Sequence, residues 1–590
     1  MIISTGTKHL QDQLFLNDLP VVSGALSRFS TSREPTIRLL KGRANYLCRH
    51  RLVRASMNAD LRDPKSKQYL QILNEWSRQT ESGDIAEVIG IPDDARIWGY
   101  ITSQSDFCSE HEADELADCF VHKARQLAQQ ADIVVVNHHL LCADLALKDE
   151  GHGELLPSAN GFIIDEAHQL PDIAAEFFGH KITSRQLNEL ARDTIATQQL
   201  VLPDMRELRD AAELLQDAIR HFRLAFGVQS RRDAWAVVKT ESRVEAEFDR
   251  LIRVLETLTA QLYEVVERDK GIDQCHRRAS HLVSQLKYLS QDPGEGNEKP
   301  TDVDPAADHY VYWFETTDRG FSLNMTPLNV ASQFRQAMQA LPATWVFTSA
   351  TLAVGGDFSH FKARLGIDES NDVLVDSPFD YANNALLYLP ENLPEPAAPE
   401  YTECLLQSCL PVVKASRGRA FLLFTSYRAL NLAERYLEQH TDFVLYCQGS
   451  APKRELVEAF QSTPNALLLG TSSFWEGVDV RGSALSCVII DKLPFGSPAD
   501  PLMSARIARM REEGGNPFFE FQVPQAAITL KQGVGRLIRD VSDRGVLVLC
   551  DPRIQTRNYG RVFVESLPPM PITRDLSEVE NFMSQETDLV

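Results

Sequence analysis

The sequence lacks the features that place a protein in a membrane or in an oxidising compartment. Its 590 residues contain no apolar run near the roughly 20 residues that a membrane-spanning helix needs. The first residues lack the basic segment and the long apolar stretch of a secretory leader. Ten cysteines are too few for a disulfide framework in a chain of this length. We therefore expect a cytoplasmic protein that does not associate with membranes.

Basic residues are also scarce. Lysine and arginine number 60 against 82 aspartates and glutamates, which gives a net charge of −22. This excess argues against binding of nucleic acid by the whole surface, although a local basic groove stays compatible with it. The length exceeds that of one ordinary core, and 43% hydrophobic residues is usual for a globular chain, so several domains are expected.

A further absence concerns phosphate binding. No Gly-x-x-x-x-Gly-Lys-Ser/Thr sequence occurs in the chain, and the backbone N–H groups and lysine of that loop are what hold the phosphates of a nucleoside triphosphate. The chain opens on Ile2–Ile3, which resembles the end of a strand too short to anchor a sheet. We expect from this that an N-terminal segment with a central strand is missing, and that the first domain is unstable alone.

What is present centres on the segment Gly161–His168, which reads Gly-Phe-Ile-Ile-Asp-Glu-Ala-His. A short apolar run that ends in acids predicts a buried parallel strand, and ligands of such sheets bind at the carboxyl ends of the strands. Asp165 could hold Mg²⁺, and Glu166 could orient and deprotonate the water that attacks a triphosphate. The same pair could instead cap the next helix, because four-residue motifs recur by chance.

Two further runs fit the same sheet. Residues 131–136 predict a strand that ends in Asn137-His138-His139, where the histidines could contact a ligand, although a structural role is commoner at a strand end. Residues 344–347 predict a strand that leads into Thr-Ser-Ala-Thr at 348–351. Those hydroxyls could link the acid pair to a neighbouring domain, or they could only cap a helix.

Three cysteines lie in an irregular region of residues 40–125, namely Cys48, Cys108 and Cys119. Three thiolates could bind an iron–sulfur cluster or zinc, but either normally takes four ligands. Cys142 and His111 are further candidates without convincing spacing. An equally open interpretation is that the three cysteines are unrelated and do not form one metal site.

After residue 182 the chain changes character twice. Residues 183–291 have apolar side chains at helical spacing and predict an all-helical insertion, which ends in the Gly/Pro-rich segment 292–297. Proline density rises over 378–399, where we place the entry to a second α/β domain. Apolar runs with polar carboxyl ends then predict a parallel, doubly wound sheet, with strands at 420–424, 466–469, 487–490 and 545–549.

Between the last two predicted strands lies Gln-Gly-Val-Gly-Arg-Leu-Ile-Arg at 532–539. In a helix, Gln532, Arg536 and Arg539 share one face. Two arginines on one face suit a triphosphate that another domain presents, as arginine fingers. A salt-bridged surface is the commoner fate of such pairs in general.

In chain order, these motifs resemble those of superfamily 2 DNA helicases of the XPD/DinG type, over nearly the whole chain, with the bacterial YoaA-like branch as the nearest match. They are the Ser-Thr-Gly-Thr turn at 4–7, Asp-Glu-Ala-His, Thr-Ser-Ala-Thr, Ser-Phe-Trp-Glu-Gly-Val-Asp at 473–479 and Gln-Gly-x-Gly-Arg-x-x-Arg. The resemblance implies an α/β fold with two RecA-like parallel-sheet motor domains. It places motor domain 1 at 1–175, with an Fe–S-type insertion at about 40–125, a helical arch at 176–305, a return to motor domain 1 at 306–375 and motor domain 2 at 376–590.

The resemblance also implies a role for individual residues. Asp165 would hold Mg²⁺ beside ATP, Glu166 would activate water, and His168 with residues 348–351 would couple the nucleotide state to the grip on DNA. The remaining implied positions are Gly477, Asp479, Gln532, Arg536 and Arg539 at the nucleotide, Thr5, Gly6, Thr7, Thr425 and Ser426 on DNA, and Cys48, Cys108 and Cys119 on a [4Fe–4S] cluster, with Ala113 where a fourth cysteine is expected.

The implied activity is 5′→3′ translocation by a monomer on single-stranded or forked DNA, in repair or replication stress. A clamp-loader accessory subunit of the replicative polymerase is the implied partner. Two departures modify this picture: without the phosphate loop we expect absent or weak ATP hydrolysis, and with three cysteines we expect a labile or absent cluster. The alternative is a non-catalytic DNA- or partner-binding protein, against which the intact acid and arginine pairs argue.

Overall fold

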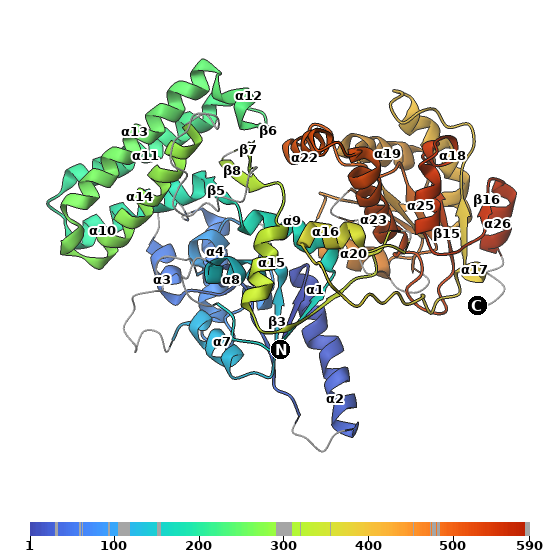
Figure 1. The fold of residues 1–590 in the computed structure, drawn as a ribbon, viewed down its shortest axis with the longest axis horizontal. Helices are drawn as coiled ribbons and strands as arrows, with labels where there is room; N and C mark the ends of the chain where they lie inside the picture. Colours follow the sequence, from blue (N-terminus) through green and yellow to red (C-terminus); the bar gives the residue numbers. More distant parts are fainter. Residues whose placement is uncertain are drawn as a thin grey trace.

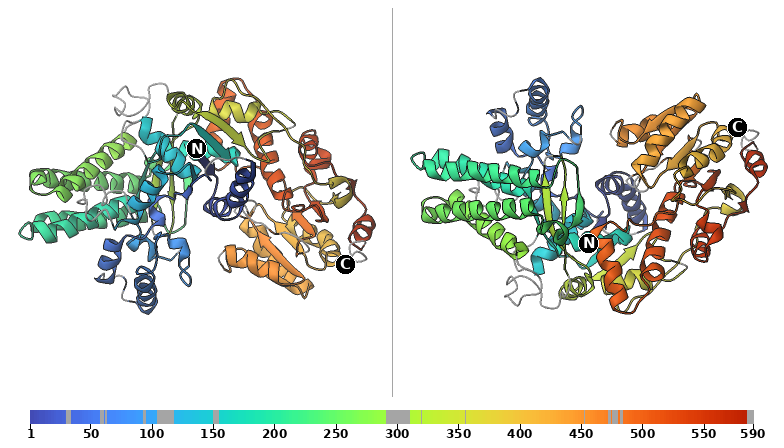
Figure 2. Two further views of the ribbon diagram at one scale, coloured as in Figure 1. Left: turned by 90° about the horizontal axis from the view of Figure 1, so that it is seen from below. Right: turned by 90° about the horizontal axis from the view of Figure 1, so that it is seen from above.

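In the computed structural model the chain forms two parallel-sheet domains and a helical arm (Figure 1). The first sheet lies between the arm and the second sheet, as the views of Figure 2 also show. The structure describes residues 1–584 except for positions 30–33, 58–60, 62, 93–94, 104–117, 150–154, 291–309, 319, 355, 452, 472–473, 475–479 and 481–483.

Five parallel strands form the first sheet, in the order β2-β3-β1-β4-β9. Their bounds are Ile2–Thr5 for β1, Ile37–Leu39 for β2, Ile133–Asn137 for β3, Gly161–Asp165 for β4 and Thr344–Thr348 for β9. Val134, Val136 and Ile164 are buried on one face, where helices α8 (His138–Asp149) and α15 (Ala331–Ala340) belong to the same core. This core fixes the carboxyl ends of the strands relative to one another.

The structure corrects the expectation for the start of the chain. β1 has four residues rather than two, and it lies in the middle of the sheet, where Ile3 pairs with Val135 on one side and Ile163 on the other. Ser4 and Thr5 are buried although they are polar. The hydroxyl of Ser4 hydrogen-bonds to His138 Nδ1 at 2.7 Å, and this partner offsets the cost of burying it.

Seven parallel strands form the second sheet, in the order β12-β13-β11-β14-β15-β10-β16. Their bounds are Ala385–Tyr388 for β10, Ala420–Leu423 for β11, Val444–Cys447 for β12, Ala466–Gly470 for β13, Cys487–Ile490 for β14, Gly545–Leu549 for β15 and Ile572–Thr573 for β16. β11, β13, β14 and β15 are the predicted strands, and every one of their residues is buried, as expected for a sheet covered on both faces.

The helical arm, which we call the arch, is not all-helical as predicted. Its base is an antiparallel sheet with strands in the order β5-β8-β7-β6. Residues 232–234 lie within the segment predicted to be helical, but they form an edge strand of this sheet and pair with β7. The helices are α10 (Ser184–Val201), α11 (Arg206–Ala225), α12 (Trp235–Lys239), α13 (Ser242–Glu264) and α14 (Lys270–Ser290). The strands are β5 (His180–Thr183), β6 (Arg232–Ala234), β7 (Tyr310–Thr316) and β8 (Phe321–Pro327).

The cysteine-bearing region between β2 and β3 has a small core of its own. Helices α3 (Arg49–Met57), α4 (Pro64–Trp76), α5 (Trp98–Ile101) and α7 (Phe120–Gln129) belong to this region. Leu47, Leu73 and Ile101 lie at its centre. In the described part of the chain, no helix is long and apolar enough to cross a bilayer.

Candidate active site

The two acids of the Asp-Glu-Ala-His segment lie at a strand end beside the hydroxyl segment. Asp165 is the last residue of β4 and pairs in register with Thr348, the last residue of β9. Glu166 follows with a left-handed backbone, φ 51° and ψ 41°. For a residue with a side chain this conformation costs about 1 kcal/mol or more, so the surrounding contacts must hold it. The turn leads through Ala167–Gln169 into helix α9 (Leu170–Phe177).

A hydrogen-bond network holds the Glu166 carboxylate. Ser349 Oγ donates to Glu166 Oε2 at 2.8 Å and lies 3.0 Å from His168 Nδ1. Thr351 Oγ1 lies 3.2 Å from the same ring nitrogen. Because the Ser349 proton points to Glu166, a hydrogen on His168 Nδ1 satisfies the remaining contacts. The hydroxyls of Thr-Ser-Ala-Thr thus bridge the acid and the histidine, rather than only capping a helix.

The second sheet reaches this network through helix α23 (Val523–Val534). The side-chain amide of Gln532 hydrogen-bonds to His168 Nε2. A hydrogen on Nδ1 leaves Nε2 as an acceptor for that amide, so one tautomer satisfies both sides of the histidine. A continuous chain of contacts therefore runs from Glu166 through Ser349 and His168 to a residue of the other domain.

The predicted helical face of three residues is wrong beyond Gln532. α23 ends at Val534 with Gly535 as its cap, and Arg536 follows in a turn. The backbone N–H of Arg539 donates to Asp543 Oδ2 at 2.7 Å. The two glycines of this motif favour an early helix end, because glycine lowers helix stability. Arg536 still lies near enough for its charge to act on Glu166.

The acids have opposite pKa shifts. Burial, and then the charge of Glu166, raises the pKa of Asp165 to about 6. Burial also disfavours the charged form of Glu166, but the hydrogen bonds from His168 and Ser349 and the charge of Arg536 outweigh it, so the pKa of Glu166 lies below its ordinary value. At neutral pH Glu166 is therefore a carboxylate that can accept a proton, which suits a general base.

The histidine pair at the end of β3 makes contacts inside the first domain, and a role toward a ligand stays a prediction. His138 is fully buried and burial lowers its pKa to about 4, so it is the neutral partner of Ser4. His139 packs edge-on against Phe177, with ring centroids 6.0 Å apart. Neither ring belongs to the chain of contacts that links the two domains.

The turn predicted to contact DNA in the first domain lies against the acid segment. Thr5 is buried and its hydroxyl donates to the Thr7 carbonyl at 3.3 Å, while Thr7 caps helix α1 (Lys8–Gln13) by accepting from the backbone of Leu10. Gly6 approaches Gln169 so closely that a Cβ would meet Oε1 at 2.1 Å. The roles of these residues on DNA stay predictions, and the buried Thr5 hydroxyl is already used inside the fold.

In the second domain the predicted DNA residues begin helix α19 (Tyr427–His440). Ser426 caps this helix by accepting from the Ala429 N–H at 3.3 Å. Thr425 donates from its backbone N–H and its hydroxyl to Asp491, at 3.1 and 3.2 Å. Burial raises the pKa of Asp491 to about 6, against the opposing effects of Lys492 and Thr425.

The titration of Asp491 leads to a stability prediction. Its folded-state pKa lies above the value near 3.9 of an unfolded chain, so protonation favours the folded state. The second domain should therefore lose stability as the pH rises from about 4 to about 6, by roughly 3 kcal/mol at most. In Asp491→Asn this part of the pH dependence should disappear. Melting temperatures of both proteins across this range test it, and parallel curves would contradict it.

Several predicted site residues lie outside the described residues, namely Cys108, Gly477 and Asp479. Cys48 precedes α3 and Cys119 precedes α7. These two thiols lie near enough for the charge of one to act on the other. Among the residues that the structure describes, no group of three metal-binding side chains occurs. The cluster stays a prediction.

No sequence pattern indicates the ion cluster between the domains. Asp172 of α9 accepts from Arg364 of helix α16 (Ser359–Leu365) and from Arg506 of helix α22 (Pro501–Glu512). In the sequence, the only signal for this ion cluster is that Asp172 lies one helical turn after His168. The two arginines come from distant segments and could not have been paired with it.

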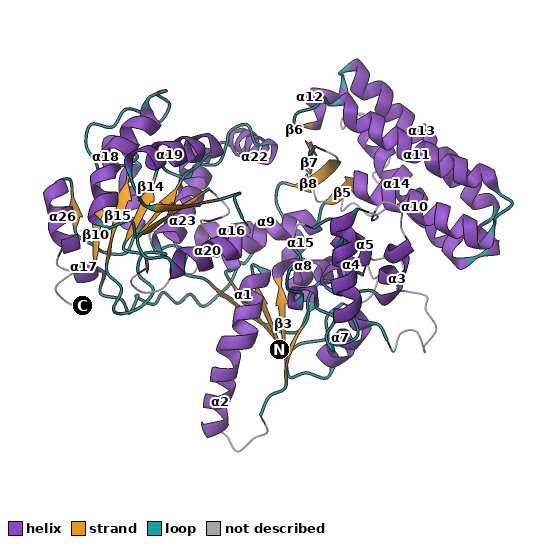
Figure 3. Ribbon diagram, turned by 180° about the vertical axis from the view of Figure 1, so that it is seen from behind, coloured by secondary structure: helices purple, strands orange, loops and turns teal. Residues whose placement is uncertain are grey.

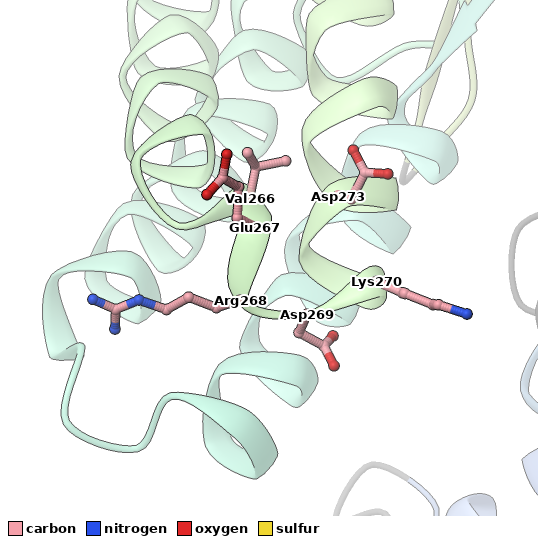
Figure 4. Close-up of a pocket in the computed structure, with 6 residues that line it drawn as sticks. All are labelled: Val266, Glu267, Arg268, Asp269, Lys270 and Asp273. Atoms are coloured by element: carbon pink, nitrogen blue, oxygen red, sulfur yellow. The ribbon is translucent and has the colours of Figure 1, made fainter.

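A shallow pocket at the outer end of the arch is a different kind of site. Figure 4 shows Arg268 and Lys270 pointing away from each other at the loop between α13 and α14. Asp269 accepts from the backbone N–H of Gly271 at 2.7 Å and so starts α14. The charged groups of this pocket do not converge on a common point. None of the acids, hydroxyls or arginines described above lines the pocket.

Comparison with known proteins agrees with this architecture. The model of a helicase C-terminal domain matches residues 409–570. The chain is 43% identical to the ATP-dependent DNA helicase YoaA of Escherichia coli K12, over 99% of this chain and 89% of that protein. It is 30% identical to the ATP-dependent helicase DinG of Mycobacterium tuberculosis, over 98% and 87%. A solved XPD helicase structure superposes with a TM-score of 0.54 at 14% identity, covering 97% of this chain and 91% of that one.

Two RecA-like domains, joined by the hydrogen bond between His168 of one and Gln532 of the other, and the similarity to YoaA and DinG define a helicase. The chain belongs to the YoaA/DinG family of helicases. The predicted α/β class and the XPD/DinG-type resemblance are thereby confirmed. We call the bodies around the first and second sheets motor domain 1 and motor domain 2.

Proposed function

We propose that this protein is an ATP-dependent DNA helicase that translocates 5′→3′ along single-stranded DNA, in DNA repair or replication stress. The chain of contacts from Glu166 to Gln532 is the observation that carries the proposal. It connects the general base of one motor domain to a helix of the other. A change at the nucleotide can therefore alter the contact between the two domains, which is what a translocating motor requires.

The residues at the cleft would divide the chemistry between them. Mg²⁺, when bound beside Asp165, would neutralise phosphate charge, and that oxygen ligand suits it. Glu166, already a carboxylate, would accept the proton of the attacking water. Ser349 and His168 hold this carboxylate in place. Arg536 and Arg539 would stabilise the charge that develops on the transferred phosphate.

The DNA track would follow the carboxyl ends of the strands. Thr7 and Ser426 each begin a helix there, and helix starts present backbone N–H groups that suit phosphates. Hydroxyl and N–H contacts to the backbone carry no sequence information, so binding should be largely independent of sequence. Forked DNA would present the same single strand to this track.

The test separates the motor from its phosphate loop. We would join the phosphate-loop segment of a family member ahead of Met1 and compare this chimaera with residues 1–590. We expect the chimaera to unwind duplexes that carry a single 5′ tail and not those that carry a single 3′ tail. Glu166→Gln should abolish this unwinding. Binding of single-stranded DNA without unwinding by either protein would instead favour the non-catalytic alternative.

We also propose that the region around Cys48 and Cys119 holds a labile [4Fe–4S] cluster with Cys108. The proximity of the two described thiols supports this assignment, and the position of Ala113 predicts incomplete ligation. Anaerobically purified protein should contain well under four irons per chain, and Ala113→Cys should raise iron and sulfide content. Full iron content without that substitution would show that another group serves as the fourth ligand.

The setting of the protein is proposed from the family resemblance. We propose a cytoplasmic monomer that binds a clamp-loader accessory subunit of the replicative polymerase. Co-purification of that subunit with the tagged protein, measured with and without nuclease treatment, tests the partner. Loss of the subunit on nuclease treatment would show that DNA alone bridges the two.

A further inference from the structure

Helix α22 lies between the arch sheet and motor domain 2, as Figures 1 and 3 show. It belongs to motor domain 2 by its place in the chain, yet Pro501 is its one buried residue. It packs against β6 and β7 of the arch sheet. Motor domain 2 therefore covers this helix only in part, chiefly where Arg506 lies over the Phe521 ring, 5.5 Å from its centroid, and contacts with the arch and motor domain 1 also hold it.

The first turn of α22 is tied to the arch by an ion pair. Arg232 of β6 donates to Asp500 Oδ2 at 2.9 Å. The same guanidinium group lies over the ring of Trp313, 4.4 Å from its centroid, which holds it in place. The other oxygen of Asp500 accepts from the backbone N–H groups of Leu502 and Met503, both at 3.0 Å. One carboxylate thus starts the helix and attaches it to the arch.

The middle of α22 is tied to motor domain 1. Arg506 donates to Asp172 Oδ1 at 3.1 Å, and Arg364 donates to the same oxygen at 2.5 Å. The guanidinium groups are largely covered, with 19% and 15% of their side chains exposed. The Asp172 side chain is 49% exposed, and the charges of the two arginines lower its pKa, so the carboxylate stays charged.

Asp172 connects this cluster to the acid site. It lies in α9, the helix that follows His168. Arg364 also donates to Gln525 Oε1 at 3.3 Å, and Gln525 lies in α23, the helix that carries Gln532. The cluster therefore joins the helix after the acids of one domain to the helix that bonds His168 from the other.

The two attachments of α22 are separated by a rigid spacer. Asp500 and Arg506 are six residues apart, which is about 9 Å along a helix. A helix of this length transmits a displacement from one end to the other, because its backbone hydrogen bonds resist bending. Movement of the arch at Asp500 must then displace Arg506, unless one of the ion pairs breaks.

We propose that α22 is a strut that couples the position of the arch to the closure of the cleft between the motor domains. Arg232 and Asp500 attach it to the arch, and Arg506 attaches it to Asp172. Asp172 and Arg506 are positioning residues in this mechanism, since they act through α9 and α23. The proposal rests on the proposed function, because the cleft is the nucleotide site of that function.

The test measures the two interfaces separately, without ATP. Bioorthogonal dyes at exposed positions would report on single molecules: Leu214 with Val444 for the arch and motor domain 2, and Val21 with Val444 for the two motor domains. The variants are Arg506→Met at one end and Arg232→Met at the other. Asp500→Ser removes the ion pair but keeps a helix-capping side chain. Arg509→Met, whose side chain bonds Glu513 of the same segment, is the matched control.

A strut predicts that each variant changes both dye pairs. The population of open conformers should rise about fivefold or more in both pairs for Arg506→Met, Arg232→Met and Asp500→Ser, and stay unchanged in Arg509→Met. Melting temperatures should match the parent protein. If each variant changes only the pair at its own interface, or changes neither, α22 is no strut. Failure of the proposed function is seen separately, in the unwinding of forked DNA by the chimaera.

Discussion

Residues 1–590 are expected to show no DNA-stimulated ATP hydrolysis above that of their own Glu166→Gln variant. Enzymes of ordinary turnover work at about 10 s⁻¹, and removing a single donor to the reacting oxygen costs about 100-fold or more. Residues 1–590 contain no Gly-x-x-x-x-Gly-Lys-Ser/Thr segment, so the several donors of such a loop are absent together from the protein tested. We therefore expect the rate with single-stranded DNA to lie at least about 100-fold below ordinary turnover, as measured by phosphate release.

Two controls give this result its meaning. The chimaera with a phosphate loop should gain a DNA-stimulated rate, and Glu166→Gln in the chimaera should remove it. Binding of single-stranded DNA by residues 1–590 should persist, which shows that the domains are folded. A DNA-stimulated rate in residues 1–590 that Glu166→Gln abolishes would mean that other groups in this chain hold the phosphates.

The second large effect concerns the stability of motor domain 1. Gly366 ends α16 with φ of +70°, and a Cβ there would meet the carbonyl oxygen of Ala331 at 2.3 Å. The clashing atoms of Ala331 belong to the backbone, so they cannot move aside as a flexible side chain could. Arg335 also donates to the Gly366 carbonyl at 2.9 Å, which holds the backbone of Gly366 in place. Gly366→Ala should therefore destabilise the domain by about 3 kcal/mol or more, as the sum of left-handed strain and a steric clash. Thermal unfolding measures the loss.

Gly356→Ala is the matched control. Gly356 has a similar φ of +84°, but a Cβ there would meet nothing within 4 Å. It should cost only the left-handed strain, about 1 kcal/mol. Equal losses in the two variants would show that the clash with Ala331 is relieved by a backbone shift. The ion cluster at Arg364, two residues before Gly366, should weaken only in Gly366→Ala.

The strands of the second sheet were predictable because of where they lie. A strand buried on both faces needs apolar side chains throughout, so Phe421 or Leu468 appears in an uninterrupted apolar run. The full length of β1 was not predicted, because Ser4 and Thr5, which make up half of this strand, are polar. The Thr5 hydroxyl bonds the nearby Thr7 carbonyl, but the partner of buried Ser4 is His138, which lies far along the chain and which a local pattern cannot show.

The sequence allowed the residues of the acid site to be predicted, but not the hydrogen bonds that connect them. Asp165, Glu166 and His168 are adjacent in the chain, so a motif names them together. That Ser349 stands between Glu166 and His168, and that Gln532 completes the histidine, follows from the packing of two sheets. α23 ends at Val534 because glycine at 533 and 535 lowers helix stability, an effect that helical spacing alone does not show.

The central position of β1 has a consequence for synthesis of the chain. Ile3 leaves the ribosome early, but its neighbours Val135 and Ile163 come much later, and β9 later still. Pairings so distant in sequence are slow to form, and an unpaired strand is prone to aggregation. The cysteine-bearing region and the arch are synthesised within these intervals and can fold first. Motor domain 1 is thus completed only after the arch, and a ribosome paused inside the arch would expose the edge of β4 that later pairs with β9.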